Sequence, residues 1–79
     1  MEHLQTIARC VKDSVQVYLD DLNGHEGAKI YQMVISEAER PLLEVVMNHA
    51  GGNITHAAQI LGINRATLRK KLKKYDLAL

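Results

Sequence analysis

The sequence is poor in residues that stabilise many small domains: it has no Trp or Phe, one Pro and one Cys among 79 residues. A single cysteine excludes an internal disulfide, and we expect Cys10 to be a small buried side chain rather than a reactive thiol. The apolar residues are mainly Ile, Leu, Val, Ala and Met, which favour helices over sheet. A chain of this length forms one domain with a marginal core, which a partner subunit would help to stabilise.

Long apolar runs are also absent. No segment of about 18 apolar residues occurs, and the N-terminal region lacks the basic, then apolar, then small-residue order of a signal peptide. We therefore expect a cytoplasmic location and no membrane partner.

The sequence gives no indication of catalysis or of a bound metal. Its histidines are not paired at the close spacings of a zinc site; they are His3, His25, His49 and His56. A Ser/His/Asp grouping, a glycine-rich phosphate loop and a carboxylate pair on a shared face are also missing. We expect a protein that is not an enzyme and that needs no cofactor or metal.

Positive charge is concentrated in the last third of the chain. Residues 1–50 carry four Lys or Arg against eight Asp or Glu, a net charge of −4, whereas residues 51–79 carry six basic residues against Asp76 alone, a net charge of +5. Such a block is typical of a surface that binds phosphate or another anionic partner.

Apolar spacings of three and four residues predict an all-α fold of four helices. The first is expected at roughly 6–22, with a seam that runs from Leu4 to Leu22, and the second over about twenty residues from Ile30 to His49 with a kink at Pro41. The third is expected near 54–61 and the fourth near 65–74. No linker is long enough to separate two domains, so residues 1–79 form one domain with a dimerisation part, 1–50, and a C-terminal part, 51–79.

Turn and capping residues mark the ends of these helices. We expect Asn23-Gly24 to end the first helix and Gly51-Gly52 the second, with Asn53 or Thr55 capping the third and Asn64 the fourth. Gly62 follows the third helix, at a position that needs positive φ. In the fourth helix one sector is apolar and packs inward; it contains Leu68, Leu72 and Tyr75.

The last two helices match the helix-turn-helix plan. Ala58 and Gly62 are four residues apart, and we expect a larger side chain at either to push the helices apart. Ile63 and Leu68 are expected to lock the pair together.

In a helix-turn-helix the second helix lies in the DNA major groove, with its N-terminal residues nearest the bases. Here these residues are Asn64, Arg65 and Thr67, and Arg65 can pair with guanine O6 and N7, which is worth about 1–3 kcal/mol of discrimination. Most of the other cations must contact phosphates, since they surround the helix; they are Arg69, Lys70, Lys71, Lys73 and Lys74. Residues at the start of the third helix can bind a phosphate; they are Asn53, Thr55 and His56. Asn53 and Thr55 could instead act only as helix caps, and the two roles can coexist.

Three segments resemble the Fis family of nucleoid-associated proteins: PLLEVVM at 41–47, GINRATLRKKLKKY at 62–75 and, less closely, DSVQVYLDDLNG at 13–24. The resemblance implies an intertwined homodimer that binds double-stranded DNA, bends it in the bacterial nucleoid and modulates transcription and chromosome organisation. It implies base contacts by Asn64 and Arg65. It implies backbone contacts by Asn53, Thr55, Thr67, Arg69, Lys70, Lys71, Lys73 and Lys74. His56 departs from the family, which usually has an arginine there.

Two further departures concern protein partners of the family. The turn AGGNI at 50–54 lacks the basic residue that the family uses near the α subunit of RNA polymerase, which argues against that activating contact. About five residues precede the first expected helix, too few for the β-hairpin arm that stimulates DNA invertases. We therefore do not expect stimulation of an invertase.

Two other functions fit parts of the pattern. A related helix-turn-helix ends the sigma-54 enhancer-binding activators, so the chain could be the C-terminal DNA-binding module of such a protein; Met1, the complete set of helices and the lack of an ATPase motif favour an independent protein. Alternatively, RKKLKKYDLAL could form a basic amphipathic helix for an anionic membrane or a protein partner. Its apolar sector is narrow, however, and the helix-turn-helix needs that sector for packing.

Overall fold

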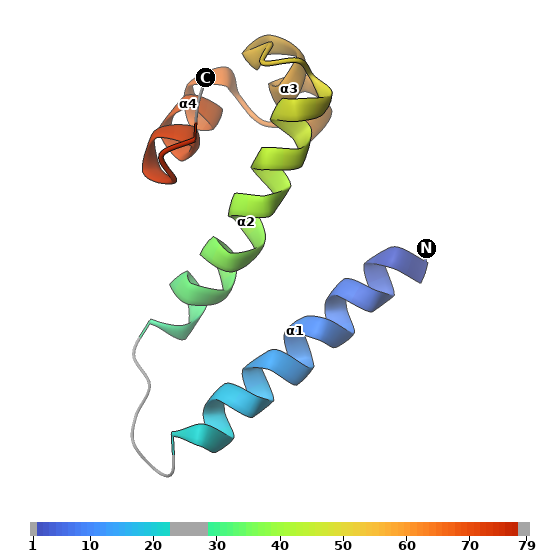
Figure 1. Cartoon of the computed structure of the whole chain (residues 1–79), viewed down its shortest axis with the longest axis vertical. Helices are drawn as coiled ribbons and strands as arrows, with labels where there is room; N and C mark the ends of the chain where they lie inside the picture. The colour runs from blue at the N-terminus through green and yellow to red at the C-terminus, as the bar shows by residue number, and fades with distance from the viewer. Residues whose placement is uncertain (1, 23–28, 78–79) are drawn as a thin grey trace. The chain divides into compact units, whose positions relative to one another are not determined.

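The computed structural model describes residues 2–22 and 29–77, which contain four helices and no strand. The helices are α1 (Glu2–Asp21), α2 (Ile30–His49), α3 (Ile54–Leu61) and α4 (Arg65–Lys74) (Figure 1). The expected all-α fold is confirmed, and α2, α3 and α4 have the predicted bounds. α1 begins four residues earlier than expected, and the predicted stop at Asn23-Gly24 lies outside the described residues.

The chain divides into two compact units, Met1–Ser36 and Glu37–Leu79. The first unit contains α1 and the start of α2, and the second contains the rest of α2 with α3 and α4. Pro41 lies inside α2 without interrupting it, so the prediction that the helix continues past this proline is confirmed. The kink expected at Pro41 stays a prediction.

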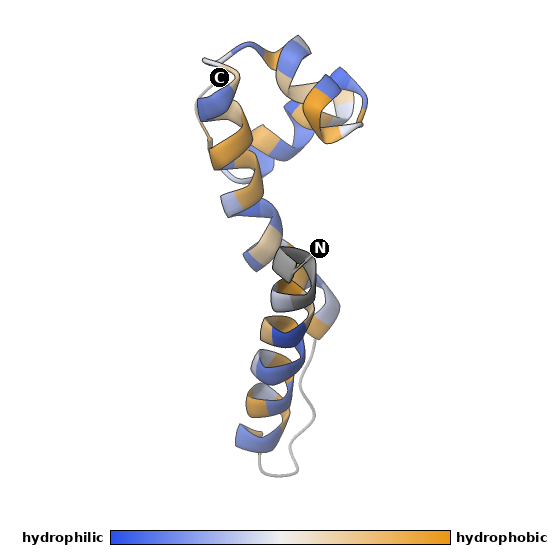
Figure 2. Ribbon diagram, turned by 90° about the vertical axis from the view of Figure 1, so that its right-hand side faces the viewer, coloured by the Kyte–Doolittle hydropathy of each residue, from blue (hydrophilic) through white to orange (hydrophobic). Residues whose placement is uncertain are grey.

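In the first unit, hydrophobic and hydrophilic residues alternate along α1 (Figure 2). Val15 and Tyr18 of the predicted seam are half-buried, whereas Val17, outside that seam, is 59% exposed. Cys10 is also exposed, so the expectation of a buried cysteine is wrong for the single chain. The spacing of apolar residues identifies a face of α1 that favours burial, but it does not show that another part of the same chain packs against that face.

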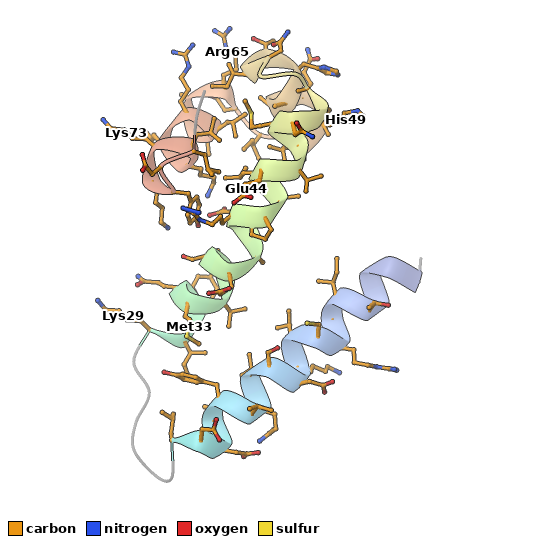
Figure 3. The ribbon with its side chains drawn as sticks, in the orientation of Figure 1. Lys29, Met33, Glu44, His49, Arg65 and Lys73 are labelled. Carbon is orange, nitrogen blue, oxygen red and sulfur yellow. The ribbon has the colours of Figure 1, made fainter. Side chains whose placement is uncertain are left out.

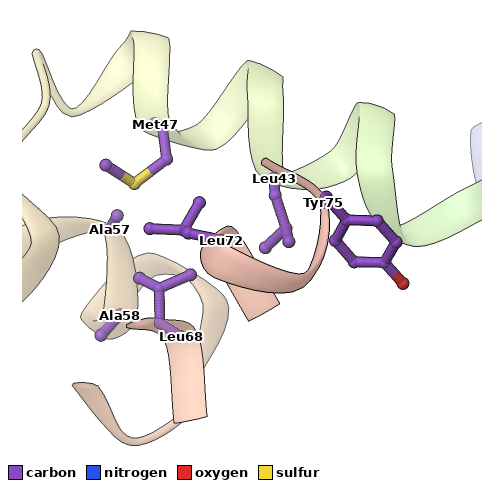
Figure 4. Close-up of a cluster of buried hydrophobic side chains, with 7 residues drawn as sticks. All are labelled: Leu43, Met47, Ala57, Ala58, Leu68, Leu72 and Tyr75. Carbon is purple, nitrogen blue, oxygen red and sulfur yellow. The ribbon is translucent and has the colours of Figure 1, made fainter. Parts of the chain in front are cut away.

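In the second unit, α2, α3 and α4 share one hydrophobic core (Figure 4). The prediction that one sector of α4 packs inward is confirmed, because Leu68 and Leu72 are fully buried and Tyr75 is nearly so. Full burial of a leucine side chain contributes roughly 1.5–3 kcal/mol. The core residues are Leu43, Met47, Ala57, Ala58, Leu68, Leu72 and Tyr75.

The turn between α3 and α4 depends on the backbone conformation of Gly62. This residue has φ 74°, and the next N–H, from Ile63, donates back to the Ala58 carbonyl at 3.1 Å. A Cβ added at Gly62 would meet nothing within 4 Å, so the expectation that a larger side chain there would separate the helices is wrong. Glycine is favoured at this position by its conformation, whereas Ala58, which is 3% exposed, occupies a packed position.

The ends of α2 and α4 have the same hydrogen-bond pattern. At the end of α2 the Gly52 N–H donates to the Met47 carbonyl at 3.0 Å, and at the end of α4 the Leu77 N–H donates to the Leu72 carbonyl at 2.9 Å. Two glycines, Gly51 and Gly52, have positive φ at the end of α2, whereas Asp76, with φ 55°, has it at the end of α4. A side chain in this conformation is strained, so α4 ends less favourably than α2 and α3.

Candidate nucleic-acid interface

The first turns of α3 and α4 are fixed by two asparagine caps. The Asn53 Oδ1 accepts from the His56 N–H at 3.1 Å, and the Asn64 Oδ1 accepts from the Ala66 N–H at 2.7 Å. Both asparagines are therefore confirmed as caps, while Thr55 lies within the first turn of α3 rather than at its cap. A cap of this kind contributes about 1 kcal/mol to helix stability.

A hydrogen bond joins these two helix starts. The Arg65 Nη1 donates to the Thr55 Oγ1 at 3.3 Å, and both side chains are exposed. Next to this bond lies an open depression of about 310 Å³, lined by Asn64, Arg65, Ala66 and Arg69. The depression therefore brings the positive N-terminal end of α4 together with two guanidinium groups, which suits an anionic ligand.

The side chains predicted to contact DNA remain accessible, with one exception. Arg65 and Lys73 extend from opposite ends of α4 (Figure 3). Lys71 is half-buried, and the other predicted residues are exposed: Asn53, Thr55, His56, Asn64, Arg65, Thr67, Arg69, Lys70, Lys73 and Lys74. Because Leu68, Leu72 and Tyr75 take up the inner sector, the exposed cations of α4 occupy its outer side and one flank.

Lys71 instead binds Glu39 on α2. The Lys71 Nζ donates to Glu39 Oε2 at 2.7 Å, and the Tyr75 hydroxyl donates to Glu39 Oε1 at 2.5 Å. The hydrogen bond from Lys71, followed by the one from Tyr75, holds the pKa of Glu39 below its usual value, although partial burial acts in the opposite direction.

Arg40 provides a further connection between the same two segments. Its Nη2 donates to the backbone carbonyl of Tyr75 at 2.6 Å, and its Nη1 lies 3.8 Å from Glu44 Oε1. We call Glu39, Arg40, Lys71 and Tyr75 the α2–α4 clamp, because their contacts attach the C-terminal end of α4 to α2.

Glu39 and Arg40 were not among the functional residues predicted from the sequence. Glu39 precedes Leu43 by four residues and Met47 by eight, so it continues the buried stripe of α2 as a charged residue. A carboxylate in line with buried apolar side chains indicates that a donor from another element will meet it. The position of Glu39 in this stripe could therefore have indicated a contact with another helix, although it does not identify Lys71 as the donor.

Within residues 2–22 and 29–77, no group of three or more His, Cys, Asp or Glu side chains could hold a metal ion. In the same ranges no helix is both long and apolar enough to cross a membrane.

Comparisons with known proteins place this arrangement in a family. Residues 34–75, from within α2 to the end of α4, match the family described as "Bacterial regulatory protein, Fis family". Two relatives named DNA-binding protein Fis, from Buchnera aphidicola subsp. Acyrthosiphon pisum strains 5A and APS, are each 49% identical over 73 residues. Each alignment covers 92% of this chain and 74% of the relative. The chain therefore belongs to the Fis family of bacterial regulatory proteins.

Proposed function

We propose that the chain is a homodimeric, nucleoid-associated protein that binds and bends double-stranded DNA, and so modulates transcription and chromosome organisation. The observation that carries this proposal is the joining of the α3 and α4 starts by Arg65 and Thr55, beside a surface of exposed cations. The relatives named as DNA-binding proteins support it. Such a protein acts on the nucleoid in the bacterial cytoplasm.

Base contacts come from the start of α4. Arg65 offers a planar group with two parallel donors that fit guanine O6 and N7. The Asn64 Oδ1 is used by the Ala66 N–H, which leaves the side-chain amide to donate to a base or to the adjacent backbone. Thr67, on the first turn of α4, adds a hydroxyl next to the same groove.

Phosphate contacts come from both helices. At the start of α3, Asn53 can cap with its oxygen and donate to a phosphate with its amide, while Thr55 and His56 lie in the first turn. Along α4 the exposed cations that contact phosphates are Arg69, Lys70, Lys73 and Lys74. With about four such contacts per subunit, a dimer should show a log–log salt slope of roughly −7.

Dimerisation follows from apolar side chains that the single chain leaves uncovered. Tyr31 and Val45 of α2 are 78% and 68% exposed, and Ile7 and Val17 of α1 are also exposed. A second subunit that covers these side chains would place two α4 helices in one assembly. When two such helices are closer together than successive major grooves of straight DNA, the duplex must bend to reach both.

A gel-shift series on circularly permuted duplexes tests binding, stoichiometry and bending together. We expect a complex of two subunits whose mobility depends on the position of the site within the fragment. A complex with one subunit, or a mobility that is independent of site position, would contradict the proposal.

A further inference from the structure

Lys71 differs from the other cations of α4 in its surroundings. Its side chain is 34% exposed and lies 2.7 Å from the carboxylate of Glu39, whose side chain is 17% exposed. Glu39 also accepts a hydrogen bond from the Tyr75 hydroxyl, so one carboxylate receives two donors from the end of α4. This ion pair is shorter and better shielded than an exposed pair, and salt weakens it less.

The position of Lys71 around α4 explains this contact. Successive residues of an α-helix are turned by about 100°, which places Lys71 within roughly 60° of the buried Leu68. By the same rotation Lys70 and Lys73 lie roughly 140–160° from Leu68, on the outer side of α4. Lys71 therefore lies next to α2, whereas its cationic neighbours face outward.

We propose that Glu39 is a positioning residue of the DNA-binding unit, which keeps the Lys71 ammonium on α2 and removes it from the cations that contact phosphate. This inference rests on the proposed function, in which α4 lies against DNA. Glu39 then acts in two ways. It fixes the end of α4 that carries Lys73 and Lys74. It also reduces the number of phosphates that each subunit neutralises by one, because Lys71 is paired with Glu39.

The dependence of affinity on salt separates this arrangement from a purely structural contact. The log–log slope counts neutralised phosphates at about 0.9 per contact, and a cation already paired with a carboxylate adds nothing to it. Glu39→Gln removes the negative charge and leaves a carbonyl oxygen that can still accept from Tyr75. Lys71 is then able to reach a phosphate, so the slope should steepen by about 0.9 per subunit.

The experiment measures the dissociation constant of one duplex over a series of salt concentrations for the full chain and its variants. Lys71→Met should leave the slope of the unaltered protein unchanged, and Glu39→Gln combined with Lys71→Met should return the steepened slope to that value. Glu37→Gln is the matched control, since Glu37 is exposed on the same helix and loses the same charge. It should not steepen the slope.

Two results of the salt series would overturn the inference. A shallower slope for Lys71→Met than for the unaltered protein would mean that Lys71 already contacts phosphate. Equal slopes for Glu39→Gln and Glu37→Gln would mean that Glu39 does not keep Lys71 away from phosphate. Thermal unfolding without DNA gives an independent test. The losses in Tm for Glu39→Gln and Lys71→Met should be less than additive when the two are combined, because the residues contact each other, and additive losses would contradict the inference.

Absence of duplex binding by the unaltered chain would overturn the proposed function and this inference with it. Intact binding with unchanged slopes would overturn the inference alone.

Discussion

The Arg65 guanidinium at the start of α4 lies 3.3 Å from the Thr55 hydroxyl in the first turn of α3. The two residues are ten positions apart, and the bond between them orients an exposed arginine. A side chain that is already oriented loses less entropy on binding. The bond itself is exposed and contributes little to stability, so its role under the proposed function is to orient Arg65 for DNA.

Substitution of Arg65 and of Lys73 should have different effects on DNA binding. Arg65→Ala should weaken a preferred site by about 1–3 kcal/mol and random duplex by less, because it removes the proposed base contact. Lys73→Ala should weaken both duplexes alike and reduce the salt slope by about 0.9 per subunit. Competition binding with both duplexes measures the two ratios, and equal losses for both variants would contradict the assigned contacts.

The hydrogen bonds of Glu39 predict an acid-dependent loss of stability. Because the folded pKa of Glu39 is lowered, the unfolded chain binds the proton more readily, and the stabilisation is complete only above the unfolded pKa. It is lost as the pH falls through the lower, folded pKa. Urea midpoints measured from about pH 7 to about pH 3, at fixed protein concentration, should therefore fall less for Glu39→Gln than for the unaltered protein. If Glu37→Gln flattens this dependence as much as Glu39→Gln does, the assignment to the clamp is wrong.

Replacement of Asp76 should stabilise the protein. Asp76 has φ 55° at the end of α4, where a side chain is strained and a negative charge opposes the helix dipole. Asp76→Gly relieves both effects, and after the greater entropy of glycine in the unfolded chain is subtracted we expect a gain of about 0.5–1 kcal/mol. Asp76→Ala removes only the charge, so a thermal melt should rank glycine above alanine. The reverse order would contradict the strain assigned to this residue.

Ala58 and Gly62 should respond to enlargement for different reasons. Ala58→Leu forces extra volume into a packed core and should cost at least about 1–3 kcal/mol. Gly62→Ala meets open space, yet it should still cost about 1–2 kcal/mol because alanine is strained at φ 74°. Urea unfolding of both variants measures these costs. A neutral Gly62→Ala would show that the turn does not depend on this conformation.

Local signals explain what could be predicted from the sequence. Caps such as Asn53 and Asn64, the glycine pair 51–52 and the spacing of apolar residues act within a few positions, so they predicted α2, α3 and α4 with the observed bounds. Exposure of the cations on the outer side of α4 followed from the same spacing.

Features that depend on distant residues were not predicted. Glu39 meets Lys71 and Tyr75 across 32 and 36 positions, and periodicity carries no information about such a pair. Cys10 was expected to be buried because it lies in a helical pattern, but burial depends on what covers the helix, and the single chain leaves it exposed. Asp76 gave no warning of positive φ, since glycine is the usual marker of that conformation.

The most direct test of the proposed bending is the end-to-end distance of a short duplex carrying a fluorophore at each end, followed by energy transfer while protein is added. Transfer should rise as two subunits bind each duplex, because both α4 helices can reach their grooves only when the DNA curves. Binding of a single subunit, or binding of two subunits with no rise in transfer, would contradict a dimer that bends DNA.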